Sequence, residues 1–337
     1  MDGFSSAIAG VGSAIGRYFS LVSFIPSFLL VGFTFALMQS GAWNGDGAPD
    51  WIRAGDAFTH LGNLATLILI SIALGVVIHP IQFSLVQFFE GYWGAGKLAQ
   101  RARAARILHH HRRFNRLQDQ GGEAEVLLEE EKSKESLNLN GRVRLVSLRD
   151  ENYRLVRSYP AVGHEDQIMP TRLGNVLRRY ERLAGHQYKL DAVQVIRHVA
   201  FVAPKEHVDY LNDQRELLDL SVRMCVTSIT AACIAIAFLW HHGPWLAIAL
   251  VPYCIAYMSY RGAVVVAHEY GAAVCTLIDL DRFALYDYLR LPRPKNTVSE
   301  RLANDALTQL LNHNPTVDLE YEYRSAPDSA TEQTKTT

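Results

Sequence analysis

Residues 64–89 read LATLILISIALGVVIHPIQFSLVQFF and contain no formally charged side chain. A run of about 20 apolar residues is long enough to cross the hydrocarbon core of a bilayer as a helix. His79 and Pro80 nevertheless stand together near the middle of this run. The stretch therefore predicts a membrane-spanning helix that carries both an ionisable group and a helix breaker.

Three further stretches have the same apolar character. They are YFSLVSFIPSFLLVGFTFALM at 18–38, MCVTSITAACIAIAFLW at 224–240 and PWLAIALVPYCIAYMSY at 244–260. Buried helices of a large soluble core are the alternative, but four uncharged runs in 337 residues favour membrane spans. We interpret the first stretch as a retained span and not a signal peptide, because its apolar region is too long and no Ala-x-Ala-like site follows it.

The positions of Lys and Arg predict how the spans are oriented. Loop 39–61 has a single Arg, and the turn HHGP at 241–244 has no Lys or Arg. Segment 94–116, by contrast, has no acidic residue and seven basic ones, which are Lys97, Arg101, Arg103, Arg106, Arg112, Arg113 and Arg116. Because basic loops stay inside, we expect both termini to be cytoplasmic in a plasma-membrane protein.

The predicted fold class is an all-α membrane protein with two transmembrane helical hairpins, which make four spans, and a mostly helical cytoplasmic insert between them. The expected segments are a cytoplasmic N-terminus at 1–17, a first hairpin at 18–89 with outer loop 39–61, a cytoplasmic helical region at 90–221 with a charged linker at 118–150, a second hairpin at 222–267, cytoplasmic amphipathic helices at 268–311 and a disordered tail at 312–337.

Within the insert, a helix is expected to follow the second span and to stop near Gly121 and Gly122. The acidic stretch 123–136 is then either a solvated helix or a flexible linker. Residues 141–160 alternate weakly between apolar and polar, which predicts a short strand pair or an irregular segment. Thr171 and Gly185 have the residue types and positions of a helix N-cap and a helix stop.

Three blocks of sequence look familiar as a set. MPTRLGNVLRRYE (169–181), YKLDAVQVIRHVAFVAP (188–204) and EYGAAVCTLIDLDRFALYDYLRLPRP (269–294) resemble blocks in a family of uncharacterised bacterial four-span integral membrane proteins. The middle block departs from that family, which often has a Trp-Pro pair where this chain has Ile196-Arg197. The resemblance implies a bacterial four-span protein, and it implies no activity.

Pro80 lacks an amide hydrogen, so we expect a kink in the second span, and Pro26 lies at a similar depth in the first span. Ser71, Gly75, His79 and Gln82 share one helix face, which should point into the bundle. In a structural interpretation, His79 and Gln82 hydrogen-bond across a helix interface. In a functional one, His79 lines a wet cavity or pore. Both stay open, and the structural one is favoured.

Other candidate motifs are weaker. The run HHHRR at 109–113 suggests a metal site, but consecutive helical residues point in different directions, so attraction of a basic face to anionic lipid head groups is the better account. HEYGA at 268–272 has Ala272 where a zincin helix needs its second His. We therefore expect no catalytic residue, no metal and no cofactor. Asp279, Asp281 and Arg282 are expected to be either paired or exposed on the helix after the fourth span, and a solvated face is the favoured account.

The net charge of −1 gives no basis for nucleic-acid binding. Three function classes remain. The favoured one is a membrane-anchored scaffold or sensor that presents a cytoplasmic helical module to a protein partner. The alternative is a homo-oligomeric ion channel with its pore lined by the Pro-kinked hairpin, since the predicted layout and FFEGYWG at 88–94 resemble bestrophin channels. A membrane enzyme is the third class, and nothing in the sequence requires it.

Overall fold

The computed structural model describes residues 19–43, 48–133, 139–314 and 317–322. It is 81% helical, and the residues that it describes form no β-strand. Four helical stretches are long and apolar enough to cross a membrane, namely Val22–Gln39, Leu61–Glu90, Lys205–Leu239 and Gly243–Leu289. The all-helical class and the four apolar stretches predicted from the sequence are thereby confirmed. The predictions for 1–17 and for most of the tail fall outside the described residues.

The chain divides into two compact units. Unit 1 consists of residues 1–179 and 212–270, and unit 2 consists of residues 180–211 and 271–337. Two long helices, α10 (Lys205–Leu239) and α11 (Leu250–Leu289), contribute to both units without a break. Both helices extend beyond the apolar stretches 224–240 and 244–260.

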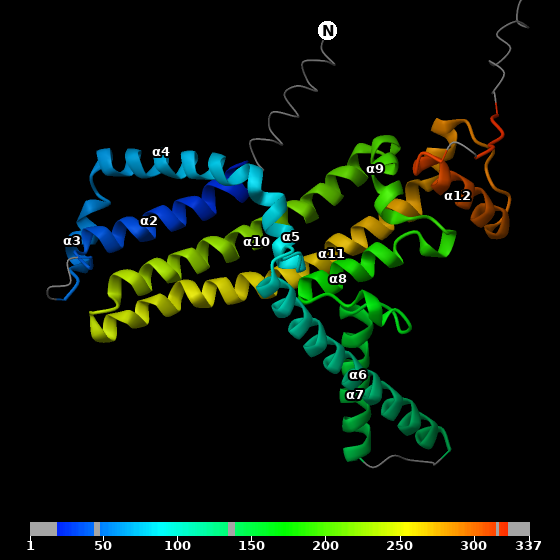
Figure 1. Ribbon diagram of the computed structural model, residues 1–337, viewed down its shortest axis with the longest axis horizontal. Coiled ribbons are helices and arrows are strands. Elements are labelled where there is room, and N and C mark those ends of the chain that lie inside the picture. Colours follow the sequence, from blue (N-terminus) through cyan, green and yellow to red (C-terminus); the bar gives the residue numbers. More distant parts are fainter. Residues whose placement is uncertain (1–18, 44–47, 134–138, 315–316, 323–337) are drawn as a thin grey trace, which may run out of the picture. The chain divides into compact units, whose positions relative to one another are not determined.

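In unit 1, the first apolar stretch begins as the π-helical turn η1 (Phe19–Phe24) and continues as α2 (Ile25–Gln39). Helix α2 packs against α3 (Trp51–Ala57) and α4 (Leu61–Ile78), as Figure 1 shows. The Asp50 carboxylate caps α3 by accepting hydrogen bonds from two backbone N–H groups, each at 3.0 Å. A short capped helix therefore occupies part of the predicted loop 39–61.

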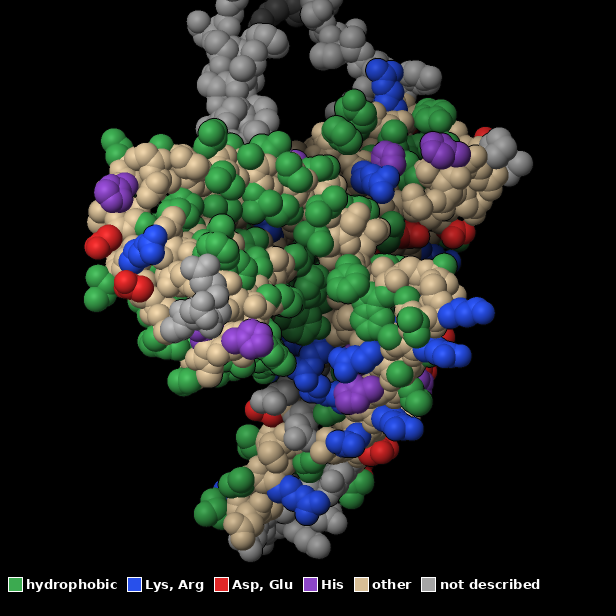
Figure 2. Space-filling model, turned by 60° about the vertical axis from the view of Figure 1, so that its left-hand side comes forward, with side chains coloured by type: hydrophobic (Ala, Val, Ile, Leu, Met, Phe, Trp, Pro, Cys, Tyr) green, Lys and Arg blue, Asp and Glu red, His purple; other side chains and the backbone are tan. Residues whose placement is uncertain are grey.

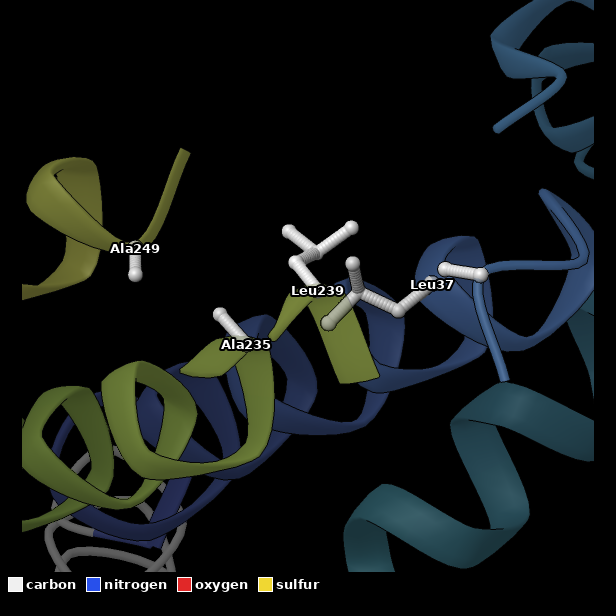
Figure 3. Packing of buried hydrophobic residues seen from close by; sticks show 5 residues of the cluster. Leu37, Ala235, Leu239 and Ala249 are labelled. Atoms are coloured by element: carbon white, nitrogen blue, oxygen red, sulfur yellow. The ribbon is translucent and has the colours of Figure 1, made fainter. Parts of the chain in front are cut away.

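A small apolar core joins the first and third apolar stretches. Figure 3 shows Leu37 of α2 facing Ala235 and Leu239 of α10, with Ala249 nearby at the end of η5 (Gly243–Ala249). The side chain of His242 supports the same end, since its Nε2 lies 2.8 Å from the carbonyl oxygen of Ala42. Small residues at these positions let the helix backbones approach closely, as is typical of packing in membranes.

The second apolar stretch is broken at the proline. Helix α4 ends at Ile78, a 3-10 turn η2 occupies His79–Ile81, and α5 (Gln82–Glu90) continues in a different direction (Figure 1). Proline cannot donate the helical hydrogen bond and its ring crowds the preceding turn, which explains the break. The predicted kink at Pro80 is confirmed.

Helices α6 (Lys97–Ser133) and α7 (Leu139–Ser158) pack against each other as an arm of unit 1 (Figure 1). Two sequence predictions are wrong here. Helix α6 does not stop at Gly121, because glycine lowers helix stability by only about 1 kcal/mol and α7 packs alongside. Residues 141–160 are almost entirely helical, because their apolar residues include the buried Leu145 and Leu148, which are three apart on one helix face.

Helix α8 (Arg172–Leu183) has the predicted ends. Thr171 Oγ1 accepts a hydrogen bond from the backbone N–H of Gly174 at 2.9 Å, which is N-cap geometry. Gly185 follows the helix with φ +72°, a left-handed conformation that suits glycine. In unit 2, the turn η4 (His186–Tyr188), α9 (Ala192–Val202) and α12 (Thr297–Leu311) pack together beside the unit's parts of α10 and α11.

Candidate functional site

A buried polar cluster joins α5 to α10 inside unit 1. The Gln82 side-chain nitrogen Nε2 donates to the backbone oxygen of Asp219 at 3.1 Å and to its Oδ1 at 3.3 Å. The Gln82 oxygen Oε1 accepts from Nε of Arg223 at 2.8 Å. One amide thus bridges an acidic and a basic residue of the same helix, and it uses both its donor and its acceptor capacity.

Burial makes this cluster energetically important. Arg223 is 0% exposed, Gln82 is 6% exposed and Asp219 is 8% exposed. An arginine stays charged at any physiological pH, and a buried charge is costly unless hydrogen bonds replace its water. Asp219 and Arg223 lie four residues apart on α10, so their side chains share one face of that helix. We therefore infer that the cluster fixes the position of α5 relative to α10 within unit 1.

The predicted small-residue face of α4 makes a close helix contact. Ser71 and Gly75 are both buried, and a Cβ on Gly75 would lie 3.2 Å from the backbone oxygen of Ser23 in η1. The Ser71 hydroxyl donates to the carbonyl oxygen of Leu67 at 2.6 Å, so it needs no partner across the interface. This part of the predicted interior face is confirmed.

The prediction that His79 faces the interior is wrong. His79 and Pro80 are exposed on the surface of the chain, whereas Gln82 is buried as expected. With about 100° of rotation per residue, His79 stands about 80° around the axis from Ser71, at the edge of the small-residue face. The change of direction after the 3-10 turn then brings Gln82, and not His79, against α10.

The two prolines also differ in their surroundings. Pro26 is buried and is the second residue of α2, directly after the π-helical turn η1. Pro80 is exposed in η2. The structure therefore does not bring Pro26 and Pro80 together into one buried site.

The basic residues expected to contact anionic lipid lie along α6. Figure 2 shows Lys and Arg side chains gathered where the arm leaves a broad hydrophobic surface. Arg113 is half-buried, and the other six are exposed, namely Lys97, Arg101, Arg103, Arg106, Arg112 and Arg116. Their exposure leaves the charges accessible, and their contact with lipid stays a prediction.

The three consecutive histidines of α6 have different environments. His110 is 1% exposed and its Nδ1 lies 2.9 Å from the Tyr159 hydroxyl, whereas His109 is exposed and His111 half-buried. Burial, with positive charges nearby, lowers the pKa of His110 to about 4, so this ring is neutral at neutral pH. Within the described part of the chain, no three metal-ligating side chains converge. His110 serves the packing of the arm's base.

A second contact between helices, which the sequence did not predict, joins the end of α5 to the start of α8. The Thr171 hydroxyl donates to the carbonyl oxygen of Glu90 at 3.0 Å. A Cβ on Gly174 would lie 2.0 Å from that same oxygen, so only glycine permits this approach. Asn175, which is 0% exposed, binds Met169 through backbone N–H and carbonyl groups, each at 2.8 Å. These residues belong to the block 169–181 and have an architectural role.

Unit 2 contains a polar network where a solvated face was expected. Arg282 Nε donates to Glu300 Oε1 at 2.6 Å, and its guanidinium lies 3.9 Å from the Tyr188 ring centroid. Asn304, 0% exposed, accepts from the Tyr286 hydroxyl at 2.6 Å and donates to the Tyr188 carbonyl oxygen at 2.9 Å. The expectation of a solvated face at Arg282 is wrong, because α12 covers it.

The two acidic residues of the same stretch are also paired. Asp281 Oδ2 lies 2.7 Å from Nδ1 of His207, and Asp281 is 7% exposed. Asp279 Oδ1 accepts from the Gln187 amide at 3.1 Å. The helix that follows the fourth apolar stretch is therefore part of the core of unit 2.

Comparisons of this chain with protein-family models, with curated proteins and with solved structures find no match. The geometry of the chain itself is thus the basis for any functional statement. Arg223 and Asp219 are the residues of the polar cluster that sequence reasoning did not single out. Their signal was an acid and a base one helical turn apart at the start of an apolar run.

Proposed function

We propose that this chain is a plasma-membrane scaffold or sensor that presents a helical module to a cytoplasmic protein partner. Two transmembrane hairpins cross the bilayer in this proposal, with both termini and the region between the hairpins in the cytoplasm. The low Lys and Arg content of 39–61 and 241–244, against seven basic residues in 94–116, supports this orientation. The resemblance of 169–181, 188–204 and 269–294 to a bacterial four-span family agrees with it.

The continuity of α10 and α11 carries the proposal. These helices have 35 and 40 residues, whereas about 20 suffice to span a bilayer. Each helix passes from unit 1 into unit 2, so a displacement of a span can be transmitted along one hydrogen-bonded rod. Such a layout suits a protein that positions or couples a module outside the membrane.

Unit 2 also exposes large apolar side chains that a protein partner would cover. Helices α9 and α12, which pack together, leave Val193, Phe201, Val298 and Leu302 exposed. Phe201 is 91% exposed, the highest value among these four. A soluble partner that covers these side chains would gain hydrophobic free energy from their burial.

Site-specific photo-cross-linking of the full chain in its native host tests the scaffold proposal. A photoreactive phenylalanine analogue at Phe201 should give one discrete adduct, and Phe201→Asp with the analogue at Leu302 should lose it. The matched control is the analogue at Val195, which is 0% exposed and should give no intermolecular adduct. The absence of any discrete adduct from Phe201 and Leu302 would contradict the proposal.

The ion channel is the second candidate, and the exposed His79 next to a broken helix favours it. An imidazole in an apolar segment is better placed in a water-filled, multi-subunit pore than in lipid. Planar-bilayer recording of the reconstituted protein separates the two functions. A unitary conductance that is lost or altered in His79→Gln would establish the channel and overturn the scaffold.

A further inference from the structure

Two pairs of arginines surround the buried His110 at the base of the arm. Helix α6 supplies Arg106 and Arg113, which are seven residues apart and lie on either side of His110 in sequence. Helix α8 supplies Arg172 and Arg179, also seven residues apart. Residues seven apart return to nearly the same face of a helix, so each helix presents one arginine pair.

The contacts show that both helices meet at one His–Tyr pair. His110 Nδ1 lies 2.9 Å from the hydroxyl of Tyr159, and Arg179 Nη1 donates to the Tyr159 carbonyl oxygen at 3.4 Å. The Phe114 ring packs edge-on against Tyr159 at 5.8 Å between centroids. The other ring nitrogen of His110, Nε2, is buried and has no hydrogen-bond partner in the described part of the chain.

The charged groups that shift the pKa values of His110 and Tyr159 are all positive. Arg106, His109, Arg113 and Arg172 each lower the pKa of His110, after burial, which is the largest cause. Arg113 and Arg172 also lower the pKa of Tyr159, against the larger effect of its burial, which raises it. Guanidinium groups that act on one buried pair create a positive potential that an anion would neutralise.

We propose that Arg106, His110, Arg113 and Arg172, the phosphate cluster, bind a phosphate group carried by a lipid head group or by free phosphate. Guanidinium forks match phosphate oxygens in geometry and charge. When the Tyr159 hydroxyl donates to Nδ1 of His110, Nε2 carries the proton and becomes a donor to the same anion. Arg106 and Arg172 are exposed and Arg113 is half-buried, so a ligand can reach all three guanidinium groups.

This inference rests on the proposed contact between α6 and anionic lipid, and it narrows that contact to one site. The remaining basic residues of α6 attract anionic lipid without a fixed geometry. The phosphate cluster differs because two helices and a buried ring contribute to it. Removing its charges must therefore weaken binding more than removing the same number of charges elsewhere on α6.

Native mass spectrometry of the full chain in neutral detergent tests the site with phosphatidic acid as the probe and phosphatidylcholine as the reference lipid. The cluster variant carries Arg106→Gln, Arg113→Gln and Arg172→Gln. The control variant, with an equal charge change, carries Arg101→Gln, Arg103→Gln and Arg116→Gln. Since each charged hydrogen bond contributes about tenfold to affinity, we expect the cluster variant to lose about a thousandfold. The control variant should lose much less, because its charges make no fixed contact with a single lipid molecule in neutral detergent.

His110→Phe provides a second test, because it retains a ring beside Phe114 and Tyr159 and leaves the formal charge at neutral pH unchanged. A loss of phosphatidic-acid affinity in this variant supports the site and has no explanation in diffuse attraction. Equal losses in the cluster and control variants would overturn the site while retaining the lipid contact of α6. No loss in either variant would overturn both.

Inorganic phosphate identifies the source of the ligand. Calorimetric titration of the full chain with inorganic phosphate should show binding that the cluster variant loses if the natural ligand is soluble. If inorganic phosphate neither binds nor displaces phosphatidic acid while the cluster variant still loses lipid affinity, the ligand is a lipid head group. Inorganic phosphate that binds the wild type and the cluster variant equally would contradict a phosphate site at these residues.

Discussion

His110 makes the stability of unit 1 depend on pH. Its pKa of about 4 lies below the ordinary value of 6.5, so the unfolded chain binds the proton more tightly than the folded chain does. Stability should therefore be full above pH 6.5 and decrease as the pH falls from 6.5 to 4, by at most about 3 kcal/mol. Thermal unfolding in detergent across this range measures the effect.

The matched variants for this prediction are His110→Phe and His109→Phe. The first removes the buried imidazole and should reduce the pH dependence between pH 4 and 6.5 without abolishing it, because burial also lowers the pKa of His268 to about 4. The second removes an exposed neighbouring imidazole, which is only one of the smaller causes of the lowered pKa of His110, and should change the dependence far less. A pH dependence in His110→Phe that is as large as in the wild type would assign it to other groups.

At the scale of single residues, the sequence predicts composition-based features better than contacts. Thr171 and Gly185 were recognised because helix ends require particular backbone and side-chain chemistry that local sequence displays. The position of His79 is not predictable in this way. The residue lies about 80° around the helix from Ser71, at the edge of the small-residue face, and the 3-10 turn at Pro80 determines which side chain meets α10. The partners of Gln82 were not predictable, since Asp219 is 137 residues away in the chain.

At the scale of the secondary-structure elements, long apolar runs were predictable and the arm was not. Apolar segments can be recognised from composition alone. The predicted ranges 64–89 and 224–240 accordingly lie within or close to helices of the structure. Helix α7 has its apolar residues distributed between buried and exposed positions, such as Leu148 and Val146, so its periodicity is weak. Its helical structure depends on packing against α6, and that contact is not visible in local sequence.

Helix α12 offers a test at the same scale, because Asn304 attaches it to Tyr188 and Tyr286. Asn304→Ala removes two buried hydrogen bonds and leaves their partners unsatisfied, which should cost about 1–3 kcal/mol. We expect faster amide hydrogen exchange in α12, measured by mass spectrometry. Asp305→Ala changes an exposed neighbour and should leave exchange unchanged. Unaltered exchange in Asn304→Ala would show that the apolar contacts of α12 hold this helix in place without the Asn304 hydrogen bonds.

At the scale of the whole molecule, separate polar contacts hold the elements where apolar packing alone gives no unique register. In unit 1, Gln82 joins α5 to α10, and Thr171 joins α5 to α8. In unit 2, Arg282 and Asn304 join α12 to the rest of the unit. Buried polar groups must find their partners, so each contact selects one arrangement among many that bury similar apolar area. The proposed scaffold requires such fixed positions.

The orientation of the whole molecule in the membrane provides the last prediction. Single cysteines at Asp46 and His241, in a background without the four native cysteines, should react with a membrane-impermeant maleimide in intact cells. A cysteine at Asn115 on α6 should react only after the cells are permeabilised. The reason is that seven basic residues in 94–116 keep that segment in the cytoplasm, whereas 39–61 and 241–244 have little basic charge to retain them. Protection of both Asp46 and His241, with labelling of Asn115 in intact cells, would reverse the orientation and place the phosphate cluster on the outer side.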